Sequence, residues 1–456
     1  MKRILLIVTG LLLLIVTATW AYWAYRQYRS YQTPIPAEAS SIIRIGVDVL
    51  TVDLAWNALW NRDYYHENQP DKPTGFDRET WSHTGIAVPA NIFLYQLNRS
   101  EQDATAEVYF GSLPLTDSSE FSRWLSEQPT LRVEQDSLGT FVYSEYVLAE
   151  YDANRVFFAL SPKKIASALP GIRKSVHTLM TSNTRSTVSE DRFPGIRKSS
   201  GHVAVMGEHP TTIEFKNGRI VFSVIHALGN PSTAEAVKPQ FPDSNTASLW
   251  IAGIPYSLAN KTFEIGPYTL HGDSLLKYDQ GNLIMEWKGS VTQQDTIIGY
   301  DYDEDFNMLE RKEVVEKPVP EIYLSIAAKE GLLNYLHAQR ILDPQGLNKE
   351  VMPLYQVGVT LVPGGFLQFY TADHYSDIPE QRSATSDALY LRVNFGSMDT
   401  TSISSAFTPY LRYFDYLEAS GQRIDGGKIA TKGTLRMRNA QINSLTQLVS
   451  ALQSAP

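Results

Sequence analysis

The feature that most constrains this chain is an uncharged apolar run near its N-terminus. From Ile4 to Ala24 there is no charged residue, and roughly 21 residues at about 1.5 Å each give a helix about 32 Å long. Because that length covers the apolar core of a bilayer, residues 1–25 are predicted to form a transmembrane anchor. Lys2 and Arg3 also fit the basic start of a cleaved signal peptide, but the length of the run favours an uncleaved signal anchor.

The flanks of the run indicate its orientation. Aromatic residues that would settle at headgroup level follow it: Trp20, Tyr22, Trp23, Tyr25, Tyr28 and Tyr31. Basic residues lie on both sides, including Arg26 and Arg29 after the run, so the positive-inside rule gives a near tie. Because the tail before the run is short and the body has no cytosolic catalytic motif, we expect the N-terminus in the cytoplasm. The body would then face the periplasm from a bacterial inner membrane.

Composition narrows the function of the body. The chain has 456 residues, which suggests more than one domain, and no cysteine. The missing thiols exclude disulfides, thiolate zinc sites, iron-sulfur clusters and a cysteine nucleophile. The formal charge is −9, and every charged residue before Glu38 is basic, so the body is more acidic still. An acidic body without long Lys/Arg runs repels nucleic acid, so we predict no nucleic-acid partner.

Two stretches rich in proline and charge suggest domain boundaries. They are Pro231–Ser244 and Glu310–Pro320, and neither has apolar periodicity. We therefore predict a first α+β domain over residues 41–236 and a second over residues 245–456. A subdivision of the second domain near residue 318 stays open.

The segment that joins the anchor to the body is predicted to be a stalk. Residues 26–40 contain proline, serine and alanine without periodicity, and a strand is predicted directly after them, at Ile42–Val49. A helix then begins near Thr51, with one apolar face made of Val52, Ala55, Trp56, Leu59 and Trp60. We expect this face to be buried against a sheet, and a groove-lining role is the alternative.

Turn signals predict that most of the body is antiparallel sheet. Asn217-Gly218 lies between two apolar runs and favours a type I′ hairpin. Similar strand-turn-strand units are centred near Asp152, Gln280 and Gly364. The resulting pattern is of repeated β-meander modules.

Several amphipathic helices are predicted beside these strands. Asp117 with Glu120, and Ser444 with Gln447, resemble capping boxes at helix starts. A strand followed by a helix is expected over Ile322–Leu336, and a further helix over residues 402–419. The fold class is therefore predicted to be α+β, with helices packed on antiparallel sheets.

Patterns that could support catalysis or cofactor binding are weak. Ser161 and Lys164 match the S-x-x-K pattern of penicillin-recognising enzymes, but the S-D-N and K-T-G partners are absent and a helix cap explains the serine better. The segment Gly421–Lys428 departs from a phosphate loop, because Ile429 replaces the required Ser/Thr. We interpret its glycines as a turn before a strand, and no catalytic or cofactor-binding residue is predicted.

Metal-binding patterns are also incomplete. Asp301, Asp303 and Asp305 alternate like the start of a calcium loop, but Phe306 replaces the turn glycine and Lys312 the closing glutamate. The histidines show no zinc-binding spacing. No metal site is predicted.

One hexapeptide, PGIRKS, occurs twice. It occupies Pro170–Ser175 and Pro194–Ser199 with unmatched flanks, which favours a duplication inside a loop. An anion site at the two Arg-Lys pairs is the alternative.

The layout resembles single-anchor bacterial envelope proteins of uncharacterised function. The resemblance is in pattern: an anchor, the phrase IPAEASSIIRIGVDV after it, β-rich modules, and KGTLRMRNAQINSLTQLV near the C-terminus. It implies a membrane-tethered envelope protein and brings no catalytic residues, cofactor or small-molecule ligand with it.

These observations favour a non-catalytic role. The leading hypothesis is a membrane-anchored envelope protein that binds or assembles with a protein partner. One alternative is a carrier of an apolar ligand such as a lipid, because curved tyrosine-rich sheets can enclose a cavity. The other is an envelope hydrolase whose residues converge only in the fold.

Overall fold

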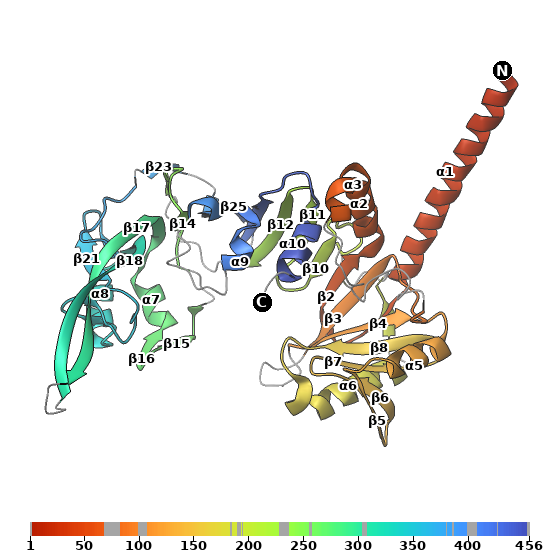
Figure 1. The fold of residues 1–456 in the computed structure, drawn as a ribbon, viewed down its shortest axis with the longest axis horizontal. Helices are drawn as coiled ribbons and strands as arrows, with labels where there is room; N and C mark the ends of the chain where they lie inside the picture. The colour runs from red at the N-terminus through yellow and green to blue at the C-terminus, as the bar shows by residue number, and fades with distance from the viewer. Residues whose placement is uncertain are drawn as a thin grey trace. The chain divides into compact units, whose positions relative to one another are not determined.

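The structure is a computed structural model (Figure 1). The chain divides into two compact units, Met1–Phe215 and Lys216–Pro456, so the division falls before the predicted one between residues 236 and 245. Both units combine antiparallel strands with helices, which confirms the α+β class. The residues that the structure describes are 2–67, 83–98, 107–182, 185–188, 193, 195–227, 237–254, 258–302, 308–379, 381–384, 387–398, 408–425 and 427–453.

Unit 1 is built on an antiparallel sheet. Its helices are α1 (Lys2–Tyr31), α2 (Val47–Trp60), α3 (Arg62–Glu67), α5 (Ser118–Ser126) and α6 (Leu169–Thr181), with the 3-10 turn η1 (Ile165–Ser167). Its strands are β1 (Pro34–Pro36), β2 (Ala39–Gly46), β3 (Asn91–Leu97), β4 (Tyr109–Pro114), β5 (Arg132–Asp136), β6 (Gly139–Tyr143), β7 (Val147–Tyr151), β8 (Arg155–Leu160), β9 (Arg185–Thr187), β10 (Val203–Met206) and β11 (Thr211–Lys216). The strand order is β11-β10-β2-β3-β4-β8-β7-β6-β5, and β1 pairs separately with β9.

The main core of unit 1 lies between this sheet and α6. Phe93, Tyr95 and Phe110 point inward from β3 and β4 and are at most 1% exposed. Ile172 and Val176 join the same cluster from α6. Because residues four apart share one face of a helix, these two side chains fix α6 on the sheet.

The last turns of α1 belong to this folded unit. Asn91 Nδ2 donates to Gln27 Oε1 at 2.7 Å and to Ser30 Oγ at 2.8 Å, and the rings of Tyr31 and Phe93 lie 5.4 Å apart. Residues 26–40, expected to form a stalk, instead continue α1, form β1 and enter β2. Among the described residues, no helix combines the length and apolarity needed to cross a membrane.

The tryptophan-bearing helix α2 forms, but its predicted burial is wrong. It begins at Val47, and the strand before it ends at Gly46. The side chains on the predicted apolar face remain exposed by 51, 58, 45 and 79%, at Val52, Trp56, Leu59 and Trp60. The one fully buried residue of α2 is Asn57, whose Oδ1 accepts a hydrogen bond from the Tyr65 hydroxyl at 2.8 Å.

Unit 2 is also built from antiparallel strands. Its helices are α7 (Gly272–Tyr278), α8 (Gly331–Ala338), α9 (Thr408–Leu411) and α10 (Ser444–Gln453), with the 3-10 turn η3 (Phe395–Ser397). The strands of the sheet, in spatial order, are β12 (Arg219–Ala227), β26 (Lys428–Met437), β25 (Phe414–Ile424), β24 (Asp387–Asn394), β14 (Ala247–Ile251), β17 (Asp279–Tyr302), β18 (Met308–Ala328), β22 (Phe366–Tyr370) and β21 (Gly358–Val362). Three small pairs complete it: β13 (Val237–Pro239) with β23 (Gln381–Ala384), β15 (Thr262–Ile265) with β16 (Tyr268–His271), and β19 (Leu342–Asp343) with β20 (Gly346–Leu347).

The core of unit 2 follows the alternation of its strands. Trp250 of β14 is fully buried, and Ile284 of β17 packs in the same cluster. A second cluster places Leu332 and Leu336 of α8 against Leu367 of β22. The predicted strand followed by a helix over Ile322–Leu336 is confirmed by β18 and α8.

Two of the predicted hairpins are confirmed. β7 and β8 turn at Asp152, whose carboxylate accepts hydrogen bonds from the amides of Asn154 and Arg155. β21 and β22 turn at Gly364 and Gly365, which have φ of 92° and 79°. Positive φ is easily adopted by glycine, so the sequence signal and the geometry agree there.

Several local predictions are wrong where strand pairing overrides them. The charged stretch Glu310–Pro320 lies inside β18, paired along its length with β17. Residues 414–419 form part of β25, between β24 and β26, rather than a helix. The segment before Gln280 is helical in α7. Gly218 has φ of 65°, but among described non-glycine residues only Asn260 and Arg340 have positive φ, so the turn there is not type I′.

Candidate functional site

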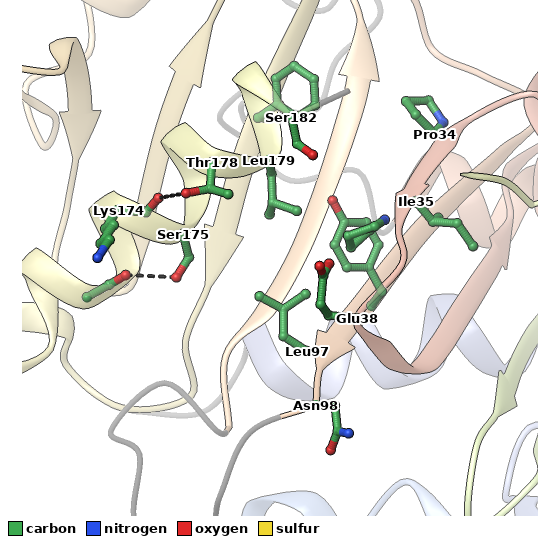
Figure 2. A pocket seen from close by; sticks show the side chains of 14 residues that line it. Pro34, Ile35, Glu38, Leu97, Asn98, Lys174, Ser175, Thr178, Leu179 and Ser182 are labelled. Atoms are coloured by element: carbon green, nitrogen blue, oxygen red, sulfur yellow. Dashed lines mark hydrogen bonds between the residues drawn. The ribbon is translucent and has the colours of Figure 1, made fainter. Parts of the chain in front are cut away.

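An open groove in unit 1, with a volume of about 480 Å³, is the strongest candidate site (Figure 2). One wall is α6, and the other is the segment from β1 to the start of β2, with β3 and β8 below. The apolar lining residues are Pro34, Ile35, Pro36, Tyr95, Leu97, Phe157 and Leu179. Ile35, Tyr95 and Phe157 are buried in the core of the unit, so the groove has a rigid apolar floor.

Polar side chains form the rim of the groove. Figure 2 shows Lys174 and Thr178 on α6 and Ser182 directly after it, facing the segment that carries Ile35 and Glu38. Lys174 and Glu38 are exposed. The rim therefore carries one positive and one negative side chain on opposite walls.

The hydroxyl groups on α6 are directed into their own helix. Ser175 Oγ donates to the Gly171 carbonyl at 2.8 Å, and Thr178 Oγ1 donates to the Lys174 carbonyl at 2.8 Å. A serine or threonine nucleophile needs its proton directed at a base. These hydroxyls accordingly have the geometry of helix back-bonding, not of an activated nucleophile.

A buried ion cluster holds α6 against the sheet beside the groove. Arg173 Nη1 donates to the carboxylate of Glu150, and its Nη2 lies 3.3 Å from Asp136 Oδ1. His177 Nδ1 lies 3.0 Å from the other oxygen of Glu150. The guanidinium also stacks over Phe141, 4.7 Å from the ring centroid. Because buried charges are stable only when paired, this cluster fixes the position of the helical wall.

The two copies of the repeated hexapeptide differ in structure. Its first copy, Pro170–Ser175, is helical in α6 rather than a loop. Arg173 turns into the ion cluster while Lys174 lines the groove, so the two side chains do not form the paired anion site that was the alternative interpretation. Pro194 of the second copy lies outside the described residues, and residues 195–199 form turns in which Ile196 is buried.

The weak catalytic pattern at Ser161 is not assembled. Ser161 Oγ accepts the amide proton of Lys163 at 3.2 Å, and Lys164 Nζ pairs with Glu145 at 3.1 Å. The next helical element, η1, begins only at Ile165, so the serine caps a local turn and not a helix. The turn predicted over Gly421–Lys428 is confirmed only in its last part, between β25 and β26, where Gly427 has φ of 70°, because Gly421 lies inside β25.

The metal pattern is only partly described. Asp301 lies in β17, and Asp303 and Asp305 lie outside the described residues. Within the described ranges, no group of three or more His, Asp or Glu side chains could hold a metal ion.

The groove itself was not identified from the sequence. Its residues come from segments far apart in the chain, and no local motif marks them. The closest signal was the hexapeptide, which contains Gly171, Lys174 and Ser175 of the lining.

Comparison with known proteins gives no family. No protein-family model and no curated protein matches the chain. Among solved structures, three crystal forms of a protein named TP0453 are similar. Crystal form III has a TM-score of 0.25 and 8% sequence identity, and the match covers 44% of this chain and 80% of that chain. Crystal form IV has a TM-score of 0.26 and 9% identity, covering 43% of this chain and 81% of that chain. Crystal form I has a TM-score of 0.25 and 10% identity, covering 45% of this chain and 82% of that chain. TM-scores of this size do not establish a common fold.

Proposed function

We propose that this chain is a membrane-anchored envelope protein that binds a protein partner and has no catalytic role. The anchor would be the run Ile4–Ala24 in α1. Its described side chains from Leu11 to Val16 are 55–65% exposed, so the folded chain does not cover them. A bilayer is the environment that would remove such a uniformly apolar helix surface from water. The N-terminus would be cytoplasmic and the body periplasmic, in a bacterial inner membrane.

The partner would bind in the groove between α6 and β1. Its apolar floor can take up the side chains of a short extended segment, while Lys174 and Glu38 can pair with charges at either side. A site for a lipid chain would be apolar throughout, whereas this lining combines an apolar floor with a polar and charged rim. The mixed lining is therefore the observation that favours a peptide segment of a partner.

The non-catalytic part of the proposal is supported by the hydroxyl geometry. Ser175 and Thr178 donate to helix carbonyls inside the groove. Ser161 and Lys164, the pair with a catalytic pattern, do not line it. A reproducible hydrolase activity of the purified chain that is lost on changing Glu38 or Ser175 would contradict this part.

Two threonines on α6 provide a matched test of partner binding. Thr178 lines the groove and Thr181 does not, yet both are exposed and both bond to the carbonyl four residues earlier. A photo-crosslinking amino acid is placed at each position in the full chain, in intact membranes. We expect position 178 to give one adduct, mapping to a single short segment of one protein, and position 181 to give none. Equal adducts at both positions, or none at 178, would contradict the proposal.

A carrier of an apolar ligand is the second candidate. It is favoured by the floor, where Ile35, Tyr95, Phe157 and Leu179 are all buried, and by a volume typical of small-molecule sites. Native mass spectrometry of the full chain released from its membrane distinguishes the two. A carrier would show an excess mass that Thr178→Trp removes and Thr181→Trp retains. A chain of bare mass that still gives the adduct at 178 would favour the partner.

A further inference from the structure

α2 is a surface helix that is apolar on both sides. Leu50 and Leu54 are half-buried toward the body, and the only fully buried residue is Asn57. The opposite side exposes Val52, Trp56, Leu59 and Trp60, which we call the tryptophan stripe. Exposed apolar side chains gathered on one helix face are normally covered, and the stripe lacks a cover within the described part of the chain.

The orientation of the stripe is fixed by contacts that α2 makes with the rest of unit 1. Asp53 of α2 lies 3.1 Å from Nε2 of the buried His202. Because Nδ1 of that ring accepts the amide proton of Phe215 at 2.8 Å, Nε2 carries the ring proton and donates to Asp53. This long-range contact with His202 restricts the rotation of α2 about its axis, and the Asn57–Tyr65 bond joins α2 to α3. The Trp56 and Trp60 rings stack with centroids 6.5 Å apart, which presents them outward as one aromatic patch.

A bidentate ion pair joins the start of the stripe to the end of the apolar run in α1. Arg26 Nε and Nη2 donate to the two oxygens of Asp48 at 3.0 and 2.8 Å, and Nη2 also donates to the Val88 carbonyl at 3.1 Å. Asp48 precedes Val52 by four residues and shares its helix face. Arg26 comes just after Ala24, the last residue of the apolar run. The stripe therefore starts where α1 would leave the bilayer.

The neighbouring part of α1 has the same chemistry as the stripe. Its exposed aromatic residues are Trp20, Tyr22, Trp23, Tyr25 and Tyr28. In Figure 1, α2 and α3 lie on the side of unit 1 from which α1 projects. Tryptophan and tyrosine rings are enriched at the boundary between headgroups and acyl chains. Exposed aromatic residues on two helices that an ion pair links are what a single bilayer interface would cover.

We propose that the tryptophan stripe of α2 lies in the interfacial layer of the same bilayer that α1 enters. This inference rests on the proposed membrane anchor. Unit 1 would then be held against the membrane at two points, with its groove at a fixed height and orientation. A helix that lies in the interface buries its apolar face at the boundary between headgroups and acyl chains, as the stripe would.

The absence of cysteine allows a direct test with the full chain. Single cysteines are introduced at three exposed positions and labelled with a polarity-sensitive fluorophore: Leu13→Cys in α1, Leu59→Cys in the stripe and Ser122→Cys on α5. The chain is reconstituted in phosphatidylcholine nanodiscs with or without nitroxide-labelled lipid. Acrylamide serves as the aqueous quencher.

The outcomes separate the inference from the proposed anchor. We expect the labels at 13 and 59 to shift to the blue, to be quenched by nitroxide lipid and to lose quenching by acrylamide, while the label at 122 stays aqueous. Lipid contact at 13 with an aqueous label at 59 would overturn the inference and leave the anchor standing. Aqueous labels at both 13 and 59 would overturn both.

One further outcome identifies a protein cover. A label at 59 that is shielded from acrylamide and from nitroxide lipid alike would mean that a partner or a second copy of the chain covers the stripe. That result would overturn the inference, because the inference places the stripe in contact with lipid.

Discussion

α2 and α5 are two short surface helices of unit 1 that bury opposite kinds of residue. α5 buries Phe121 and Leu125 and leaves its polar side in water. α2 buries Asn57 and leaves Trp56 and Trp60 exposed. The comparison teaches that periodicity marks where an apolar face lies, but not whether the chain itself will cover it. In α5 the remaining residues are polar except Trp124, which packs against the same cluster as Phe121 and Leu125, whereas α2 has apolar residues on both sides.

The largest expected effect is a difference in stability between two variants, each of which truncates one aromatic residue in one of the two helices. Phe121→Ala should lower the free energy of unfolding by about 3–5 kcal/mol, because Phe121 is 2% exposed and packs on Tyr151. Trp60→Ala should change it by no more than about 0.5 kcal/mol, because the side chain is 79% exposed. Urea denaturation of the detergent-solubilised chain measures both. Equal losses would show that Trp60 is covered by the protein.

A second prediction concerns the buried polar residue of α2. Asn57→Leu should destabilise the chain by about 1–3 kcal/mol, since Tyr65 loses its buried acceptor even though the new side chain is apolar. Ala55→Leu, at an exposed position of the same helix, is the matched control and should stay within about 0.5 kcal/mol. The same denaturation experiment measures both. A stabilising Asn57→Leu would mean that α2 can rotate to bury its apolar side.

A third, smaller effect is expected at the link between α1 and α2. The hydrogen-bonded carboxylate of Asp48 raises the pKa of the Arg26 guanidinium, which is therefore charged at every working pH. Arg26→Gln removes this pair, so hydrogen exchange should become faster in the first turn of α2 and unchanged in α5. Arg123→Gln, in the last turn of α5, is the control. Unchanged exchange in α2 would show that the link does not hold the helix.

The smallest effect is a pH dependence of the side-chain cap at the start of α5. The amides of Glu120 and Ser119 donate to Asp117 and lower the pKa of its carboxyl group from 3.8. A lowered pKa means that this cap contributes fully above the unfolded value and is lost as the pH falls through the folded value. α2 follows Gly46 and has no side-chain cap. The carboxyl ¹³C shift of Asp117 should titrate below 3.8, and a midpoint at or above 3.8 would contradict the cap.

Most of the candidate site could not be predicted from the sequence, because its residues come together only through contacts between distant segments. The groove joins Ile35, Tyr95, Phe157 and Leu179, which are ordinary apolar positions in four separate elements. Their shared location depends on strand order, and β3 lies between β2 and β4 only after pairing. Of the sequence patterns, the hexapeptide contributes Gly171, Lys174 and Ser175 to the groove, and the phrase that begins at Ile35 contributes Ile35, Pro36 and Glu38, but neither pattern indicated a groove.

The sequence correctly predicted those elements that depend only on residues close together in the chain. The cap at Asp117, the glycine turn at Gly364 and the strand followed by a helix over Ile322–Leu336 are confirmed, because each depends on residues within a few positions. The sequence also determined the α+β class through its mixture of alternating and helical periods.

Tertiary structure decided the features that depend on partners distant in sequence. Residues 414–419 are strand because β24 and β26 pair on both of their sides, which outweighs their helical period. The outward face of α2 was decided by His202 and Arg26, which hold the carboxylates of Asp53 and Asp48 in place. Apolar burial has no direction of its own, so directional hydrogen bonds and ion pairs selected the face that remains exposed.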